Sequence, residues 1–362
     1  MQDIIEKNKE LSSRFEGFDF LRAFFSIVVV ALHANIFNIL STEKLKLVDV
    51  ANVLNINFGY LSVPVFLQIS LFLFYINREK YGQKYFSQKR LPRLVSLYFF
   101  WSLLKIIFDF VLNKNTEIFR TVFSSTSDTF LFVISGGHTI FYFFFSLLFT
   151  TTICEFLVIF EEKRKIKLNS VKLSYLLLFL SCVLIFCFPL IDIYFNKKEV
   201  FTYVANPLNF LPYVFTAKIV AQEFISNKLK KLTSSLSINL SLLFAFCVSL
   251  IIFEWIFLKD LPHYSRLFPN YSRISLVFVS FFLLYISVLS TRSVPTIINF
   301  ISKYSLGIYG FHIFFIDYVV LFDNLSPLLP SLITITKFVI ALLGSIVLSL
   351  VFKKFKLTKE FV

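Results

Sequence analysis

Three ionisable side chains lie in an apolar segment near the N-terminus, FEGFDFLRAFFSIVVVALHA (residues 15–34): Asp19, Arg22 and His33. On a helix, Asp19 and Arg22 share one face because residues three apart are neighbours. His33 returns to that face eleven residues after Arg22, about 16 Å further along at 1.5 Å per residue. An imidazole can take a proton from a hydroxyl group at neutral pH. The stripe predicts an acid–base site in a protein-lined cavity; an interfacial ion pair with a packing His33 is the alternative.

A second motif, QKRLPRLVSLYFFW (residues 88–101), places Arg90 and Arg93 one helical turn apart around Pro92. Guanidinium groups bind phosphate through paired hydrogen bonds, and the first turn of a helix adds partial positive charge to an anion site. The spacing therefore predicts a phosphate clamp. The alternative is that both arginines only anchor a helix end at the cytoplasmic membrane surface.

Two further histidines are candidates for contacts with a substrate. His138 precedes an apolar window, and His312 lies in SKYSLGIYGFHIFF (residues 302–315), where Ser305, Tyr309 and His312 fall roughly on one helix face. Packing roles are the alternative for both. The four cysteines lie in apolar stretches without C-x-x-C spacing, so we expect neither a disulfide framework nor a metal site.

The elements that must position these residues are transmembrane helices. Of 362 residues, 57% are hydrophobic and only 16% are charged. This is enough for about ten spans of roughly 20 residues each, and a spanning segment must satisfy its own backbone groups, as a helix does. The expected fold is an all-α integral membrane protein, a bundle of about ten transmembrane helices in a single domain over residues 1–362. The apolar windows are 16–40, 58–77, 94–112, 139–160, 173–194, 208–225, 237–258, 274–290, 299–322 and 332–352.

The positive charges give the expected orientation. If the chain crosses the membrane at each window, 23 of the 36 Lys and Arg residues lie on the side of the membrane that holds the N-terminus and 9 lie on the opposite side. The rest lie within the spans. Positive residues gather on the cytoplasmic side, so both termini are expected in the cytoplasm of a multi-pass protein of the inner or plasma membrane. The net charge of +14 is then explained by topology, and nucleic acid is not expected as a partner.

Taken together, these motifs resemble the acyltransferase 3 family of membrane-bound O-acyltransferases, which act on cell-surface glycans. Arg22 and His33 match the family's Arg-x10-His spacing, and Arg90 and Arg93 its cytoplasmic Arg-x-x-Arg. SLGIYGFHIFF (305–315) resembles a late Ser-Tyr-x-x-Tyr-x-x-His element, and GGHTIFYFFFSLLF (136–149) loosely matches the start of the fourth span. Two positions depart from the family pattern, with Leu71 in place of glycine after Ser70 and Leu306 in place of tyrosine.

The resemblance implies transfer of an acyl group, expected to be acetyl, from cytoplasmic acyl-CoA to a hydroxyl of a cell-surface polysaccharide or lipid-linked glycan precursor. His33 would be the general base, and Asp19 would orient Arg22. The donor would be held by three arginines, Arg22, Arg90 and Arg93. The glycan would meet His138, Tyr309 and His312.

The resemblance also sets expectations for cofactors and partners. Acyl-CoA is a co-substrate, no cofactor is bound permanently, and no metal is required. The bilayer surrounds the protein, and a homo-oligomer or a glycan-assembly machinery is a possible further partner.

Two other classes of function fit a polar stripe in a helix bundle. One is an exporter of polysaccharide or lipid-linked glycan, which should contain inverted repeats or broken helices near the midplane. The other is a glycan polymerase, for which a large charged outer loop is expected. The sequence contains no convincing repeat, and no outer loop exceeds about 25 residues by the window boundaries.

Overall fold

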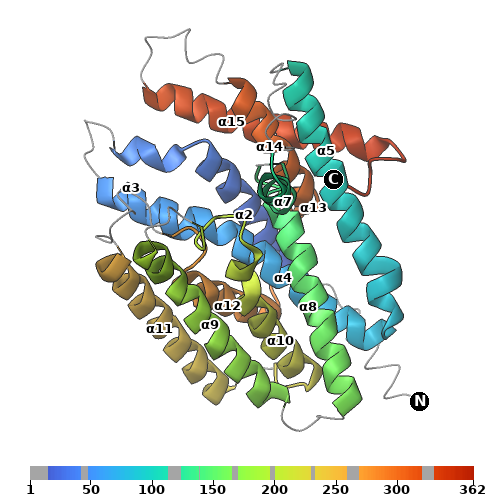
Figure 1. The fold of residues 1–362 in the computed structure, drawn as a ribbon, viewed down its shortest axis with the longest axis vertical. Coiled ribbons are helices and arrows are strands. Elements are labelled where there is room, and N and C mark those ends of the chain that lie inside the picture. Colours follow the sequence, from blue (N-terminus) through green and yellow to red (C-terminus); the bar gives the residue numbers. More distant parts are fainter. Residues whose placement is uncertain are drawn as a thin grey trace. The chain divides into compact units, whose positions relative to one another are not determined.

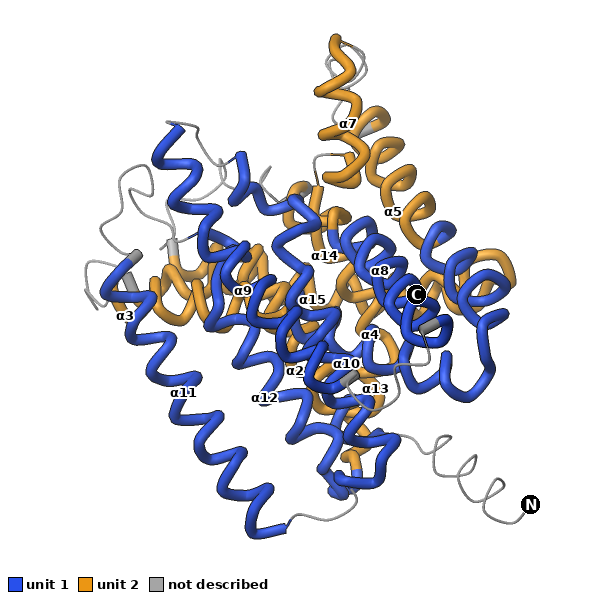
Figure 2. The backbone as a smooth tube through the Cα atoms, turned by 60° about the horizontal axis from the view of Figure 1, so that its bottom comes forward, with its two compact units in different colours: residues 1–18, 63–96, 143–293 blue, residues 19–62, 97–142, 294–362 orange. Residues whose placement is uncertain are grey.

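The computed structural model describes residues 15–41, 48–112, 124–137, 139–164, 170–195, 200–229, 233–258, 269–319 and 330–362. Throughout these ranges the regular structure is helical and no strand occurs, so the prediction of an all-α protein is confirmed. The chain divides into two compact units, coloured differently in Figure 2. Unit 1 comprises Met1–Phe18, Val63–Ser96 and Phe143–Ser293, and unit 2 comprises Asp19–Ser62, Leu97–Tyr142 and Val294–Val362.

Unit 1 is organised around one buried helix. Its helices are α4 (Tyr60–Tyr81), α8 (Tyr142–Arg164), α9 (Ser170–Tyr194), η4 (Pro207–Phe210), α10 (Leu211–Ile225), α11 (Ser234–Leu258) and α12 (Ile274–Leu289). Helix α10 packs against α9 and α12, and α12 packs against α11 (Figure 1). Ten consecutive residues of α10, from Pro212 to Ala221, are buried. An apolar helix buried all round is a core helix, so α10 forms the core of this unit.

Buried ion pairs connect the helices of unit 1. Arg78 on α4 contacts Glu155 on α8 at 2.9 Å and Glu162 at 3.1 Å. Lys218 on α10 pairs with Glu161. Charges in an apolar surrounding are stable only when they are paired, so these contacts fix the register of α4, α8 and α10. The carboxylates of α8 thus have structural partners within unit 1.

Unit 2 contains the helices that carry most of the predicted catalytic residues. They are α2 (Glu16–His33), η1 (Ile36–Ser41), α3 (Val48–Leu54), η2 (Asn55–Gly59), α5 (Leu91–Leu112), α7 (Thr126–Ile134), α13 (Thr296–Lys303), α14 (Ser305–Val319) and α15 (Pro330–Lys354). The first residues of α2 and α5 belong to unit 1. Helix α14 packs closely against α15. A Cβ at Gly310 would lie 2.1 Å from the Trp101 ring, so only glycine lets α14 approach α5 this closely.

The helices agree only in part with the ten expected spans. Every window contains a helix, but within the described residues six helical segments are long and apolar enough to cross a membrane. They are Asp49–Tyr81, Phe86–Val111, Tyr142–Lys163, Val171–Tyr194, Ser234–Phe257 and Ser331–Lys354. Ile274–Leu289 and Ser305–Asp317 are shorter apolar helices. The count of ten spans stays a prediction.

Two windows were wrong as continuous helices. The window 16–40 is interrupted at Asn35, whose φ of 58° lies in the left-handed region that asparagine tolerates. The window 299–322 is divided at Tyr304 between α13 and α14. Short helices in the expected outer loops, α3 and α7, were also missed.

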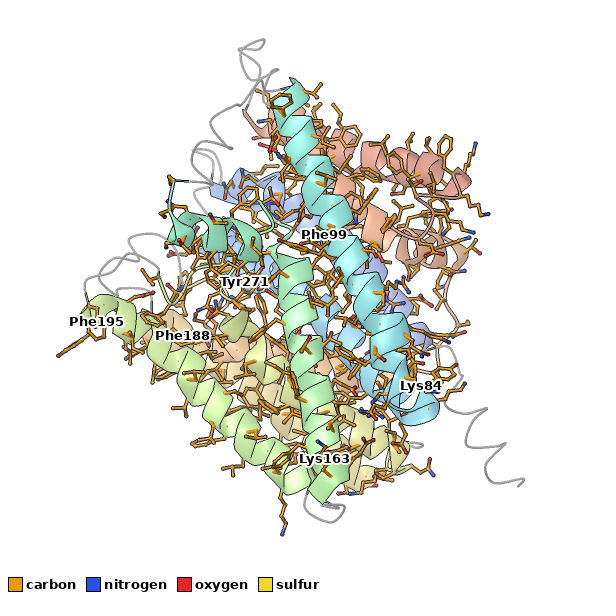
Figure 3. All side chains as sticks on the ribbon, turned by 45° about the vertical axis from the view of Figure 1, so that its right-hand side comes forward. Lys84, Phe99, Lys163, Phe188, Phe195 and Tyr271 are labelled. Atoms are coloured by element: carbon orange, nitrogen blue, oxygen red, sulfur yellow. The ribbon has the colours of Figure 1, made fainter. Side chains whose placement is uncertain are left out.

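Apolar side chains cover outward faces of the long helices. On α5, Phe99, Leu103 and Ile107 are exposed at four-residue spacing, whereas Trp101 and Lys105 on another face are buried. Helix α11 is exposed along most of its length, with Leu242 and Ile256 more than 60% accessible. Figure 3 shows the side chains around the labelled Phe99. Extended apolar surfaces of this kind indicate contact with lipid, and together with the six apolar segments they define a membrane protein.

The orientation can be tested by cysteine labelling in intact cells. We expect residues 78–93 and 161–172 to be cytoplasmic, and residues 41–57 and 113–137 to be outside, because of the charge distribution. Lys84→Cys and Lys172→Cys should resist an impermeant thiol reagent, whereas Ser124→Cys should react. The native cysteines are buried or half-buried, which keeps the background low. Strong labelling at position 84 from outside would reverse the orientation.

Candidate functional site

The candidate catalytic residues lie on one helix of unit 2. Asp19, Arg22 and His33 all belong to α2, so the helical spacing predicted for them is confirmed. The position of His33 along the helix differs from the expectation. His33 is in the last turn of α2, immediately before the break at Asn35, and not halfway along a longer helix. The imidazole is half-buried. The stripe therefore begins in the first turn of α2 and finishes at its C-terminal end.

The second histidine of unit 2 lies directly beside His33. The ring centroids of His33 and His312 are 5.2 Å apart, with the ring planes inclined by 41°. His312 is fully buried on α14, and its Nδ1 is 3.1 Å from the Ile308 carbonyl oxygen. The sequence assigned His33 to catalysis and His312 to glycan binding. The fold brings them into one site because α14 packs its His312 face against the end of α2.

Tyr309 is close to this pair but its hydroxyl is engaged. It donates a hydrogen bond to the Ile140 carbonyl oxygen at 2.6 Å, and its ring centroid is 6.0 Å from that of His312. The bond holds the chain just after residue 138 against α14. His138 itself lies outside the described residues, so its predicted role stays a prediction.

Asp19 has a partner that sequence spacing could not indicate. Its Oδ1 accepts a hydrogen bond from Ser302 Oγ at 2.6 Å, which ties the first turns of α2 to α13. The Asp19 side chain is buried and Arg22 is half-buried. Ser302 is 283 positions away in the chain. The proposed effect of Asp19 on the orientation of Arg22 stays a prediction.

A further charged group of unit 2 is a lysine of α5. Lys105 Nζ lies 2.5 Å from Asp109 Oδ1 and 3.1 Å from Asp317 Oδ2. Lys105 and Asp109 are four residues apart on α5, a spacing that predicts their pairing. The contact with Asp317 on α14 depends on the packing of the two helices. This triad joins α5 to the C-terminal part of α14, the helix that carries His312.

Unit 1 contains the two arginines of the predicted clamp, in different environments. Phe86–Arg90 form a π-helical turn that continues into α5, and Arg93 follows in the first turn of α5. Arg90 is half-buried and its Nη2 donates to Ser70 Oγ at 2.5 Å and to the Ser70 carbonyl oxygen at 3.4 Å. Arg93 is exposed. The two arginines therefore lie in different environments, with Arg90 bound to Ser70 of α4 and Arg93 exposed, and the phosphate clamp stays a prediction.

The charge of Arg90 is not neutralised within its surroundings. Across the residues that the structure describes, its contacts are with the neutral Ser70, and its buried Nε makes no hydrogen bond. Arg78, by contrast, has two carboxylate partners. A partly buried cation without an anion is costly, so Arg90 is the group in unit 1 that most favours an anionic ligand.

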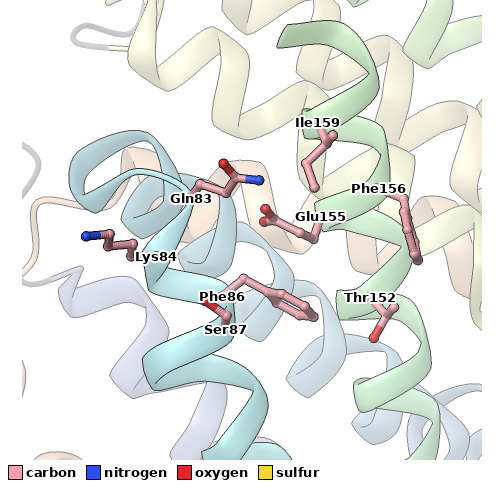
Figure 4. Close-up of a pocket in the computed structure, with 8 residues that line it drawn as sticks. All are labelled: Gln83, Lys84, Phe86, Ser87, Thr152, Glu155, Phe156 and Ile159. Atoms are coloured by element: carbon pink, nitrogen blue, oxygen red, sulfur yellow. The ribbon is translucent and has the colours of Figure 1, made fainter. Parts of the chain in front are cut away.

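A cavity of about 300 Å³ lies beside the connection that leads to Arg90 (Figure 4). Its walls come from two segments of unit 1, the connection 83–87 and the C-terminal half of α8. The lining residues are Gln83, Lys84, Phe86, Ser87, Thr152, Glu155, Phe156 and Ile159. The lining combines two phenylalanine rings with Lys84, whose ammonium end points away from the other lining side chains, and with Glu155, which is paired with Arg78 (Figure 4). Within the described ranges, no cluster of His, Cys, Asp and Glu suits a metal ion.

The geometry thus defines a helical membrane protein with a paired-histidine site in one unit and an unneutralised arginine in the other. The chain belongs to the acyltransferase 3 family, whose acyltransferase-domain model matches residues 15–354, nearly the whole chain. It is therefore an acyltransferase, and it transfers groups other than aminoacyl groups. Comparisons with curated proteins and with solved structures give no match.

Proposed function

We propose that the protein moves an acyl group, in the first instance acetyl, from cytoplasmic acyl-CoA to a hydroxyl of a cell-surface polysaccharide or lipid-linked glycan precursor. Family membership supports acyl transfer, and the pairing of His33 with His312 in unit 2 is the observation that carries the chemistry. A hydroxyl acceptor needs a base to remove its proton, and His33 is a half-buried imidazole suited to that role.

The donor side of the proposal rests on unit 1. CoA carries several negative charges, and residues 78–93 contain Arg78, Lys80, Lys84, Lys89, Arg90 and Arg93. Arg78 is already paired, whereas Arg90 is half-buried and has a buried Nε without a hydrogen bond among the described residues, which makes it available to a phosphate. The exposed Arg93 and Lys84 would attract the polyanion through longer-range electrostatics. The cavity between Phe86 and Phe156 has room for part of the nucleotide.

The acceptor side of the proposal rests on unit 2. His33 takes the hydroxyl proton as the oxygen attacks the thioester carbonyl carbon. Arg22, held on the same helix, would stabilise the negative charge that develops on the carbonyl oxygen or a nearby phosphate. His138, Tyr309 and His312 are the residues that we assign to the surroundings of the glycan. The transferred group and the glycan are identified here only by class.

Family membership favours this function over export or polymerisation of a glycan. The sequence contains no convincing repeat of the kind expected in an exporter.

The proposal is tested by incubating purified protein with radiolabelled acetyl-, propionyl- or succinyl-CoA and a panel of cell-surface glycans. We expect label in at least one glycan, linked through an ester that mild base removes. Release of free CoA without glycan labelling would contradict a glycan acceptor. If none of the three donors binds, the acyl-CoA assignment fails.

A further inference from the structure

The unpartnered ring nitrogen of His312 is the starting point. Its Nδ1 lies 3.1 Å from a backbone carbonyl oxygen, which can only accept, so Nδ1 carries the proton and Nε2 carries the lone pair. This Nε2 is buried and has no hydrogen-bond partner in the described part of the chain. Buried polar atoms are nearly always satisfied. An acceptor left open in a fully buried position therefore points to a proton or a ligand that arrives during the working cycle.

His33 is the neighbour best placed to supply that proton. The centroid separation of 5.2 Å, with the rings inclined by 41°, leaves the two rings close enough for one water molecule to bridge a nitrogen of each. Among the described residues, Tyr309 is a titratable group beside the pair, and its hydroxyl donates to the Ile140 carbonyl oxygen. Tyr142 lies close to Tyr309. None of these contacts occupies His312 Nε2.

We propose that His312 is a proton-relay partner of His33 and acts on the reaction through it. This inference rests on the proposed function. As the hydroxyl oxygen bonds to the acyl carbon, its proton moves to one nitrogen of His33. The proton on the other nitrogen of His33 moves to Nε2 of His312. The carbon–sulfur bond breaks, and CoA leaves as a thiolate. The proton then returns from His312 through His33 to that thiolate, so that an ester and a free thiol are formed.

The relay gives His312 a role different from the glycan contact expected from the sequence. Its full burial and the engaged Nδ1 leave little of the ring for a sugar. The relay also keeps charge off His33 at the moment of transfer, because the proton that it gains on one side leaves on the other. A general base that is reset in this way can serve the next acceptor without exchanging a proton with bulk water.

The kinetic test compares two replacements of His312. Gln keeps a hydrogen-bond acceptor but cannot carry the proton, and Phe removes both properties. We expect both variants to lose kcat by up to about 10²-fold, the lower range for acid–base catalysis, with KM for acyl-CoA unchanged. The acidic limb of the pH–rate profile should report two coupled groups in the wild type and one in His312→Gln. Phe311→Leu, which alters packing at the adjacent position, should leave the shape of the profile unchanged. Near-normal kcat in His312→Gln would overturn the relay.

A spectroscopic test remains decisive if the His312 variants do not fold. The chain has only four histidines, so ¹⁵N-histidine labelling of the whole protein in lipid nanodiscs gives few signals. We expect His33→Gln to shift the Nε2 resonance of His312, and His263→Gln to leave it in place. An unchanged His312 resonance in His33→Gln would overturn the proposal. This readout needs no substrate, so its outcome is separate from that of the glycan-acylation assay.

Discussion

His33→Gln should abolish glycan acylation, with a loss of about 10² to 10⁴ in rate, the range expected when a general base is removed. Glutamine can keep a hydrogen bond at this half-buried position in the last turn of α2, so the helix and the amount of folded protein should persist. Acyl-CoA binding should remain nearly normal, because the partner of His33 is the acceptor hydroxyl. The loss of rate is measured as turnover per folded molecule in proteoliposomes. The affinity for acyl-CoA is measured separately by a donor-binding titration.

His263→Gln is the matched control for this variant. It makes the same chemical change in a segment that the sequence places in an outer loop, and we expect wild-type turnover from it. A packing role for His33 predicts a different pattern, in which glutamine is at least partly tolerated and the loss follows the amount of folded protein. Near-normal turnover per folded molecule in His33→Gln would remove His33 from catalysis.

Arg90→Ala should weaken acyl-CoA binding roughly ten- to a hundredfold. The loss of a hydrogen bond to a charged group costs about 1.5–3 kcal/mol, and Arg90 is a half-buried cation whose hydrogen bonds among the described residues are made to Ser70 and not to a carboxylate. Its removal should not unfold unit 1, since the contact that it loses is with neutral Ser70. Titration of fluorescent CoA into purified protein measures the change, and wild-type affinity should fall as salt rises.

Arg93→Ala makes the same substitution one turn away, at an exposed position. We expect a smaller loss of affinity, because solvent screens a charge on the surface. Ser70→Ala separates the two properties of Arg90, since it removes the contact that orients the guanidinium but keeps the charge. Equal affinities for wild type and Arg90→Ala, together with lower expression, would show that Arg90 only anchors the helix in the membrane.

The parts of the site that could be predicted are those encoded by local spacing. Asp19, Arg22 and His33 were found because helical periodicity aligns them, and α2 has that periodicity. Arg90 and Arg93 were found by the same argument, but their unequal burial was not. Arg90 is the less exposed of the two because its side chain contacts Ser70 on α4. Ser70 is 20 residues away in the chain, so helical spacing does not indicate this contact.

The parts that could not be predicted depend on contacts between distant segments. The pairing of Asp19 with Ser302 and that of His33 with His312 each join helices from opposite ends of the chain. A sequence without aligned relatives carries no signal for such contacts. The break after His33 had a local signal in Asn35, a residue type that tolerates the left-handed conformation. A hydropathy window does not detect this break, because apolar residues lie on both sides of Asn35 and extend the window to residue 40.

The most direct test is a sided transfer assay in proteoliposomes. Protein is reconstituted with a known orientation, labelled acyl-CoA is added on the side of residues 78–93, and the glycan is supplied on the other side. We predict that label appears in the glycan, that transfer requires His33, and that omission of acyl-CoA leaves the glycan where it was. Movement of unlabelled glycan across the bilayer, or equal labelling by wild type and His33→Gln, would contradict an acyltransferase that uses His33 as its base.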